Sequence, residues 1–194
     1  MDGSKSSLWS TVVDIIETVV VAAAIFVVVY LFLLQPHQVK GASMEPTFHD
    51  SEYILTDKVS YRFSQPQRGD VVIFKAPTNP DVDFIKRIVA LPGERLEIKN
   101  STIIIYNDEN PRGFTLSEPY EIMEPIVGGS YLREGKIIEI PENSYFVFGD
   151  NRTHSFDSRE WGPLTKDKII GKAWIRYWPI TKISIIRRAS YPNE

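Results

Sequence analysis

The sequence contains no cysteine, and this absence removes several classes of protein at once. A disulfide scaffold, a zinc site built on thiolates and a cysteine nucleophile all require that side chain. The absence does not fix the cellular compartment, because proteins without disulfides occur on both sides of a membrane.

An excess of basic charge is also missing. The 194 residues carry 22 Lys plus Arg against 25 Asp plus Glu, a formal net charge of −3. Proteins that bind nucleic acid usually have a basic excess, so this balance argues against a nucleic-acid partner. With 43% hydrophobic and 24% charged residues, the composition is typical of a globular protein, and the length is enough to bury a core.

The longest apolar run lies near the N-terminus, where residues 19–34 contain no charged side chain. At about 1.5 Å per residue this run covers about 24 Å, slightly less than a bilayer core of about 30 Å. Extending it back to Trp9 supplies the missing turns. We therefore predict one transmembrane helix over 9–34, after a short segment, 1–8.

Two alternatives compete with a transmembrane helix. A cleaved signal peptide usually has a basic start and small residues before its cleavage site, and this segment has neither pattern. A buried core helix that is apolar on all sides would need a larger domain to cover it. Charge alone does not orient the helix, because Lys5 and Lys40 flank it on opposite sides.

Beyond Gln35 the pattern changes to short runs rich in β-branched residues, separated by Pro and Gly. The following runs are typical of strands: 71–74, 84–90, 102–106, 137–140, 145–148 and 173–177. No sustained helical period follows, although 165–170 has room for a turn or two. We predict a mostly β domain over 35–194.

Two stretches of this domain stand apart in composition. Residues 107–135 are the richest in Pro, Gly and Glu, which favours an insertion of loops or a small β-rich subdomain. Residues 187–194 have the composition of a polar tail.

Ser43 is a candidate nucleophile. It follows Gly41 and Ala42, whose small size lets a substrate backbone come close, and it precedes Pro46, which stiffens the turn. A serine in such a loop is usually only a turn residue, so the assignment requires a base.

Histidine and lysine are the candidate bases. Of the three histidines, His154 lies near Asp157 and suggests a Ser-His-Asp triad, but base and orienting residue would be only three positions apart. A solvated loop histidine is the favoured interpretation. Lys86 lies in the strand-like run 84–90, where burial would lower its pKa and make it a base. The alternative is a surface lysine whose stem covers apolar neighbours.

Four blocks occur in one order after the apolar segment: GASMEPT (41–47), RGDVVIF (68–74), IKRIVALPGE (85–94) and GDNRTHSFDSREWG (149–162). This pattern resembles that of the type I signal peptidases, membrane-bound Ser/Lys proteases that remove signal peptides from exported preproteins. The resemblance spans nearly the whole chain and is weakest at 107–135. It implies a signal-peptidase-like β-fold catalytic domain with a β-rich insertion, preceded by one N-terminal transmembrane helix.

The resemblance also implies roles for individual residues. Ser43 matches the nucleophile, Lys86 the general base and Ser155 the serine that orients the lysine amine. Asp157 and Arg159 match residues that hold the last block together, most simply as an ion pair.

Further positions in these blocks carry structural expectations. Arg87 is expected to face away from Lys86 and pair with Asp150, and Met44 to pack beneath the nucleophile loop. The backbone N–H of Ser43 would stabilise the oxyanion. Some family members add a serine hydroxyl at the position of Gly41, so the second oxyanion donor stays open here.

In this family the substrate is cut after small residues at positions −1 and −3, through an acyl-enzyme. An extended substrate would lie beside Asp83, Phe84 and Ile85 on one side and Gln38 and Val39 on the other. No cofactor and no metal is expected.

The resemblance implies a single pass through the plasma membrane, with a monomeric catalytic domain on the extracytoplasmic side and the short N-terminus, 1–8, in the cytoplasm. The partners are secretory preproteins and the lipid bilayer. Trp161 and Trp178 are candidates for the membrane interface, or else for the core.

Two other functions compete with this reading. A self-cleaving repressor uses a related Ser/Lys pair, but the membrane helix and the fourth block argue against it. A catalytically silent, membrane-anchored scaffold is disfavoured because Ser43, Lys86 and Ser155 are all present.

Overall fold

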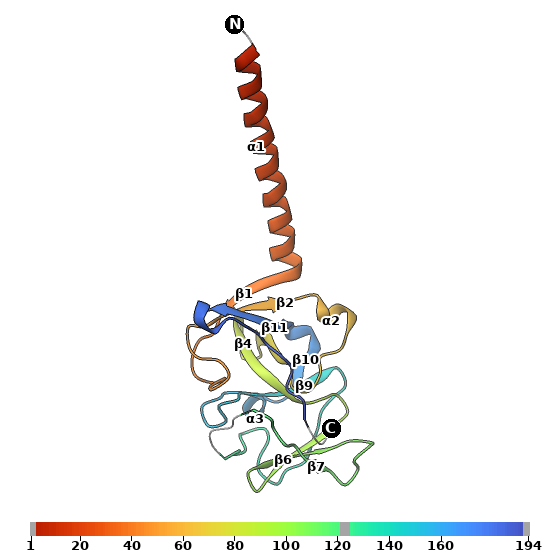
Figure 1. Cartoon of the computed structure of the whole chain (residues 1–194). Coiled ribbons are helices and arrows are strands. Elements are labelled where there is room, and N and C mark those ends of the chain that lie inside the picture. Colours follow the sequence, from red (N-terminus) through yellow and green to blue (C-terminus); the bar gives the residue numbers. More distant parts are fainter. Residues whose placement is uncertain (1–2, 121–124, 192–194) are drawn as a thin grey trace.

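The computed structural model describes residues 3–120 and 125–191. Helix α1 (Gly3–Val28), continued by a π turn η1 (Val29–Leu33), stands away from the body of the molecule (Figure 1). Helical structure ends one residue before the predicted position, and strand β1 begins at Leu34. The cause is Pro36, which lacks an N–H and holds the preceding residue in an extended conformation.

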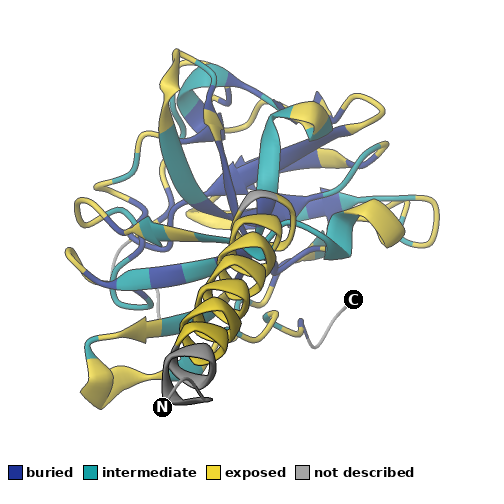
Figure 2. Cartoon of the chain, turned by 90° about the horizontal axis from the view of Figure 1, so that it is seen from above, coloured by how far each residue is buried: buried dark blue, intermediate teal, exposed yellow. Residues whose placement is uncertain are grey.

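None of α1 between Trp9 and Val28 is buried against the protein, as the view along its axis also shows (Figure 2). This exposure excludes the alternative of a buried core helix. Within the described residues, α1 is the one helix long and apolar enough to cross a membrane.

An eight-stranded antiparallel sheet, here called the main sheet, lies at the foot of α1 (Figure 1). The strand order is β1-β2-β11-β3-β4-β9-β10, with β12 also paired to β11. The strands are β1 (Leu34–Gln38), β2 (Tyr53–Asp57), β3 (Val71–Ala76), β4 (Asn79–Ala90), β9 (Ser144–Phe148), β10 (Leu164–Thr165), β11 (Ile169–Trp178) and β12 (Ser184–Ile185).

A second, four-stranded sheet lies at the end of the body far from α1 (Figure 1). Its order is β7-β6-β5-β8, formed by β5 (Arg95–Lys99), β6 (Thr102–Tyr106), β7 (Phe114–Thr115) and β8 (Ile138–Glu139). Asn100 and Ser101, both with positive φ, make the two-residue turn between β5 and β6. The sheet begins before the 107–135 stretch, which supplies β7 alone among its described residues, 107–120 and 125–135.

The helical elements of the body are short. They are α2 (Ser60–Phe63), α3 (Ser158–Trp161) and the 3-10 turns η2 (Lys166–Lys168) and η3 (Ile180–Lys182). Turn η2 falls within 165–170, where the sequence left room for a helical turn.

Strand β3 shows that the main sheet packs against apolar side chains on both of its faces. Val71 and Ile73 belong to one buried apolar cluster, whereas Val72 and Phe74 belong to a second cluster on the opposite face. A strand buried on both faces reads as a continuous apolar run rather than an alternating one. The main sheet therefore has a core on each side.

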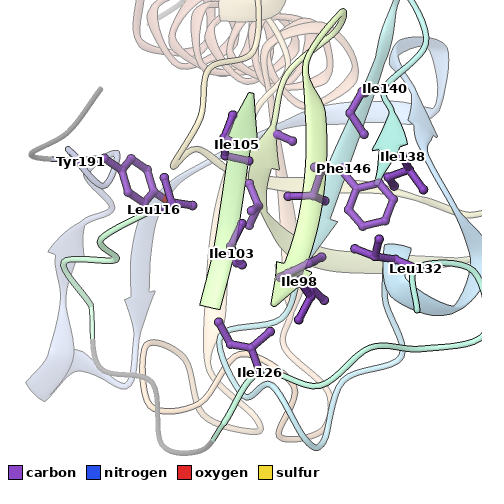
Figure 3. Close-up of a cluster of buried hydrophobic side chains, with 14 residues drawn as sticks. Ile98, Ile103, Ile105, Leu116, Ile126, Leu132, Ile138, Ile140, Phe146 and Tyr191 are labelled. Atoms are coloured by element: carbon purple, nitrogen blue, oxygen red, sulfur yellow. The ribbon is translucent and has the colours of Figure 1, made fainter. Parts of the chain in front are cut away.

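A third apolar cluster joins the second sheet to the end of the main sheet (Figure 3). Ile98 of β5 and Ile103 and Ile105 of β6 pack in it with Phe146 of β9. Buried residues alternate along β6, as expected for a strand with one buried face, whereas Leu96, Glu97 and Ile98 of β5 are all buried.

All the runs predicted as strands form strands. The prediction of a polar tail at 187–194 holds for Arg187, Arg188 and Ser190, which are exposed, but is wrong at Ala189 and Tyr191. Tyr191 is buried in the third cluster, and the Ala189 N–H donates to the carbonyl of Gly69 (3.3 Å). A Cβ at Gly69 would lie 2.4 Å from the Ala189 oxygen. The tail packs because this glycine lets the two backbones approach. Residues 192–194 lie outside the described residues.

Candidate active site

The loop that carries Ser43 is held at its base by hydrogen bonds between Val39 and the two residues that precede strand β2. The N–H of Val39 donates to the carbonyl of Glu52 (2.8 Å), and the N–H of Ser51 donates back to Val39 (2.9 Å). Met44 is fully buried beneath the loop, as predicted. The loop is therefore anchored from below, with Ser43 half-buried at its upper surface.

Lys86 lies on β4 and reaches Ser43. Its Nζ donates to the Ser43 Oγ (2.7 Å) and to the carbonyl of Ile85 (3.0 Å). The residue is only 4% exposed. Burial lowers the pKa of Lys86 to about 8, against the opposing charges of Asp157 and Asp150. This burial excludes the alternative of a surface lysine, and a substantial fraction of the amine is neutral near physiological pH.

The segment after β9 also holds the loop that carries Ser43, in addition to the contacts with Glu52 and Lys86. The Asn151 N–H donates to the carbonyl of Ser43 (3.1 Å), and the Asn151 Nδ2 donates to the carbonyl of Ala42 (3.1 Å). A Cβ at Gly149 would lie 2.4 Å from the Ser43 carbonyl oxygen and 2.3 Å from the Ser155 Oγ. Gly149 is the position where this packing requires glycine.

Asp157 and Arg159 form the expected ion pair, with Nε–Oδ1 and Nη2–Oδ2 distances of 2.9 and 2.8 Å. Asp157 also accepts from the Gly149 N–H (3.0 Å), while Arg159 donates to the carbonyl of Arg152 (2.6 Å). Both side chains are buried, which is tolerable because each charge has several partners. The pair ties the start of the last block to α3.

Arg87 and Asp150 form a second buried pair, as expected. The Nε–Oδ1 and Nη2–Oδ2 distances are 2.9 and 2.7 Å, and Thr47 Oγ1 donates to the same carboxylate (2.6 Å). Because Lys86 and Arg87 are consecutive on β4, this pair anchors the backbone from which Lys86 extends.

Ser155 is close to the site without the expected bond. Its Oγ is buried and makes no hydrogen bond within the part of the chain that the structure describes. Its role in orienting the Lys86 amine therefore stays a prediction.

His154 has the character of an exposed loop histidine. Its Nδ1 faces Thr153 Oγ1 (2.9 Å) and Asn151 Oδ1 (3.3 Å), whereas the carboxylate of Asp157 is occupied by Arg159 and Gly149. The geometry gives no support to a Ser-His-Asp triad.

The N–H of Ser43 is available as an oxyanion donor, since no hydrogen bond among residues 3–120 and 125–191 uses it. The neighbouring N–H of Gly41 is occupied, because it donates to Asp50 Oδ1 (2.7 Å). Gly41 has a φ of +82°, and an added Cβ there would meet nothing within 4 Å. The second oxyanion donor is therefore not the Gly41 N–H in this conformation.

A groove of about 460 Å³ opens beside Ser43 and Lys86. All the residues expected to bind substrate line it: Gln38, Val39, Asp83, Phe84 and Ile85. The sequence analysis missed further lining residues: His37, Ile54, Ile73, Val82 and Phe156. The two-residue period of strands could have indicated His37, because it shares a face of the chain with Val39.

Comparison with known proteins places these residues in a family context. The family model described as signal peptidase, peptidase S26, matches residues 12–178. The chain is 30% identical over 183 residues to the probable signal peptidase I-2 of Synechocystis sp., covering 91% of this chain and 78% of that protein. It is 31% identical over 183 residues to signal peptidase IB of Staphylococcus aureus strain COL, covering 87% and 92%.

Among solved structures, a signal peptidase I from Enterococcus faecalis shares 29% sequence identity, with a TM-score of 0.44. The likeness covers 56% of this chain and 97% of that one.

Proposed function

The chain belongs to the signal peptidase family, peptidase S26, serine endopeptidases that remove signal peptides, and we propose that Ser43 and Lys86 perform this reaction here. The observation that carries the proposal is the 2.7 Å contact between the Ser43 Oγ and a buried lysine amine. A serine hydroxyl becomes nucleophilic when a neighbouring base takes its proton, and burial makes Lys86 such a base.

The reaction proceeds in two halves. Neutral Lys86 accepts the Ser43 proton as the Oγ attacks the carbonyl carbon of the residue at −1, and the Ser43 N–H stabilises the oxyanion. The peptide C–N bond then breaks, and Lys86 passes the proton to the departing amine. In the second half Lys86 takes a proton from water, which attacks the acyl-enzyme, and the proton returns to the Ser43 Oγ.

The substrate is proposed to bind as an extended strand in the groove. The first half of β4 pairs with β3, while β9 pairs with β4 only from Arg87 onward. The other edge of residues 79–86 is therefore open in the described structure, as is the outer edge of β1. A peptide between these edges would gain backbone hydrogen bonds, with the side chains at −1 and −3 on one side.

Helix α1 anchors the chain in a membrane, and we propose that the body rests on the same bilayer, on the extracytoplasmic side. Strands β11 and β12 and the turn η3 between them lie at the end of the body that carries α1 (Figure 1). In or beside these elements, six large apolar side chains are exposed, here called the β11 patch: Trp174, Tyr177, Trp178, Ile180, Ile183 and Ile185. Trp and apolar side chains favour the interface. Trp161 instead packs against Phe74 in the core, with ring centroids 5.9 Å apart.

The test of the catalytic assignment compares wild type with Ser43→Ala, Lys86→Ala and His154→Ala in detergent, on a preprotein whose signal peptide ends in Ala-x-Ala. Wild type and His154→Ala should cut the preprotein, whereas the other two should not. Lys99→Ala, which removes an exposed lysine of β5, is the matched control and should cut normally.

The assignment of the base is wrong if Lys86→Ala still cuts and His154→Ala does not. If wild type is inert on several preproteins, the scaffold function replaces the peptidase. For the topology, protease added to intact cells should degrade the domain after α1; its protection would place that domain on the cytoplasmic side. A single species in detergent at the mass of one chain is expected for a monomer.

A further inference from the structure

His37 and Asp83 face each other across the groove from strands that are not neighbours in the sheet. Strands β2, β11 and β3 lie between β1 and β4 in the strand order. Nevertheless, His37 Nε2 is 3.3 Å from Asp83 Oδ2, and both residues line the groove. The main sheet therefore curls until its first strand faces the open half of β4, and this pair bridges the gap.

The pair lies along the groove, away from the reacting atoms. On β4, Asp83 precedes Lys86 by three residues, about 10 Å of strand. On the facing segment, His37 precedes Val39, which leads into the Ser43 loop. Both strands thus carry their polar residue on the same side of the catalytic pair.

The alternation of side chains arranges the groove wall in two layers. Asp83 and Ile85 share one face of β4, and His37 and Val39 share one face of the opposite segment. The layer nearer Ser43 is apolar, formed by Val39 and Ile85. The next layer is polar, formed by His37 and Asp83, although Ile54 and Ile73 beside it are apolar.

His37 is held in a defined protonation state. Burial lowers the pKa of His37, against the opposing effect of Asp83, so the ring is neutral at neutral pH. Its Nδ1 lies 2.8 Å from Thr56 Oγ1. Because the carboxylate of Asp83 can only accept, the proton belongs on Nε2, and the Thr56 hydroxyl donates to Nδ1.

The pair retains hydrogen-bonding capacity. Neither His37 Nε2 nor Asp83 Oδ1 has a well-directed hydrogen bond in the part of the chain that is described. Asp83 has one further charged neighbour, Lys75, whose Nζ is 2.8 Å from Oδ1 and whose side chain is about half exposed. A substrate group that both donates and accepts would complete the bonding of this pair.

Building on the proposed function, we propose that His37 and Asp83 contact the side chain at −3 of the preprotein and favour a small hydroxyl side chain, Ser or Thr, at that position. In an extended peptide the −3 side chain points to the same side as that at −1, about 7 Å further along, which brings it to the polar layer. A hydroxyl can donate to Asp83 Oδ1 and accept the His37 Nε2 proton in place of the 3.3 Å contact with Oδ2, whereas valine, of the same shape, offers neither bond and leaves these buried atoms unpaired.

The test uses two peptides that are identical except for Thr or Val at −3. Wild type should cleave the Thr peptide with a kcat/KM about five to ten times higher, the range expected for one buried hydrogen-bonding group. The double variant His37→Leu with Asp83→Leu should lose or reverse this ratio, which compares two peptides within one variant and so does not depend on the variant's overall rate. Asp81→Asn, at an exposed residue of the same strand, is the control and should keep the wild-type ratio.

The inference is overturned if wild type cleaves both peptides equally, or if the double variant keeps the preference for Thr. The ratio for wild type is measured without any variant, so it tests the preference for Thr even if the double variant does not fold. In that case Asp83→Asn, which preserves the shape of the side chain, should reduce the ratio. If wild type cleaves neither peptide nor an Ala-x-Ala preprotein, the proposed function itself has failed. Cleavage with a ratio of one refutes the inference and leaves the proposed function standing.

Discussion

The part of the main sheet around Ser43 buries a group of charged side chains beside its apolar clusters, whereas the strands of the second sheet bury one, Glu97 of β5. Around the Ser43 site, charged side chains are buried: Lys86, Arg87, Asp150, Asp157 and Arg159. The third cluster, which holds the second sheet, is formed by aliphatic and aromatic side chains. Burying charge is costly and is repaid only by good pairing. The difference indicates that one end of the body is organised to position a reaction and the other to supply stability.

The largest effect should come from breaking a buried ion pair. In Asp157→Ala, Arg159 would lose its carboxylate partner while it stays buried, which costs about 3–5 kcal/mol. We expect the thermal unfolding midpoint to fall strongly in detergent, together with activity. Asp81→Ala removes an exposed carboxylate and should change neither the unfolding midpoint nor activity. If both variants lowered them equally, the burial of the ion pair would not be the cause of the loss.

Truncation in the third cluster should lower stability without changing the chemistry. Ile103→Ala removes a side chain that is 1% exposed, which costs about 2–5 kcal/mol. At a temperature where the variant is still folded, kcat/KM per folded molecule should equal that of wild type. A selective loss of kcat would show that the second sheet also positions the site.

Gly149→Ala should lower activity more than stability, because it disturbs the geometry of Ser43, the proposed nucleophile. The new Cβ would displace the Ser43 carbonyl or the Ser155 side chain. A displacement of about 1 Å at a catalytic group costs roughly 100-fold in rate. We expect kcat to fall by this order while the unfolding midpoint falls less than in Ile103→Ala. Gly135→Ala is the control for activity, because an added Cβ there meets nothing within 4 Å; its φ of +74° means that the variant will lose some stability, so it does not serve as a control for the unfolding midpoint.

The smallest effect is the pH response of the buried lysine. Because burial lowers the pKa of Lys86 to about 8, kcat/KM should fall about tenfold per pH unit below this value and level off above it. The free energy of unfolding should also rise with pH. Between about pH 8 and 10.5 the unfolded lysine, with its ordinary pKa of 10.5, still binds a proton that the folded lysine has lost, so deprotonation stabilises the folded state. A profile with its midpoint near 6.5 would instead point to a histidine. Ile103→Val should keep the wild-type midpoint.

Sequence patterns predicted the strands with strong side-chain signals. Strand β6 occupies the predicted residues, and β3 and β9 agree within two residues. Strands β1, β2 and β5 were missed, as were the two-residue strands β7, β10 and β12. Strand β1 contains Pro36 and polar residues, which is typical of an edge strand and carries little propensity signal. The short strand β5 alternates charged and apolar residues, and its stability comes from pairing with β6.

The sequence by itself determined features that depend on local patterns or short motifs. These are an apolar helix of membrane length, a mostly β body, and Ser43 and Lys86 as candidate catalytic residues. Tertiary structure decided what depends on distant residues. The Lys86 amine is near Ser43 because β4 and the β1–β2 loop converge, and its lowered pKa is caused by the atoms that bury it. His37 meets Asp83 only because the main sheet curls, and Tyr191 is buried only because the tail crosses Gly69. A contact between residues far apart in the chain depends on how whole strands pack, and no local pattern encodes it.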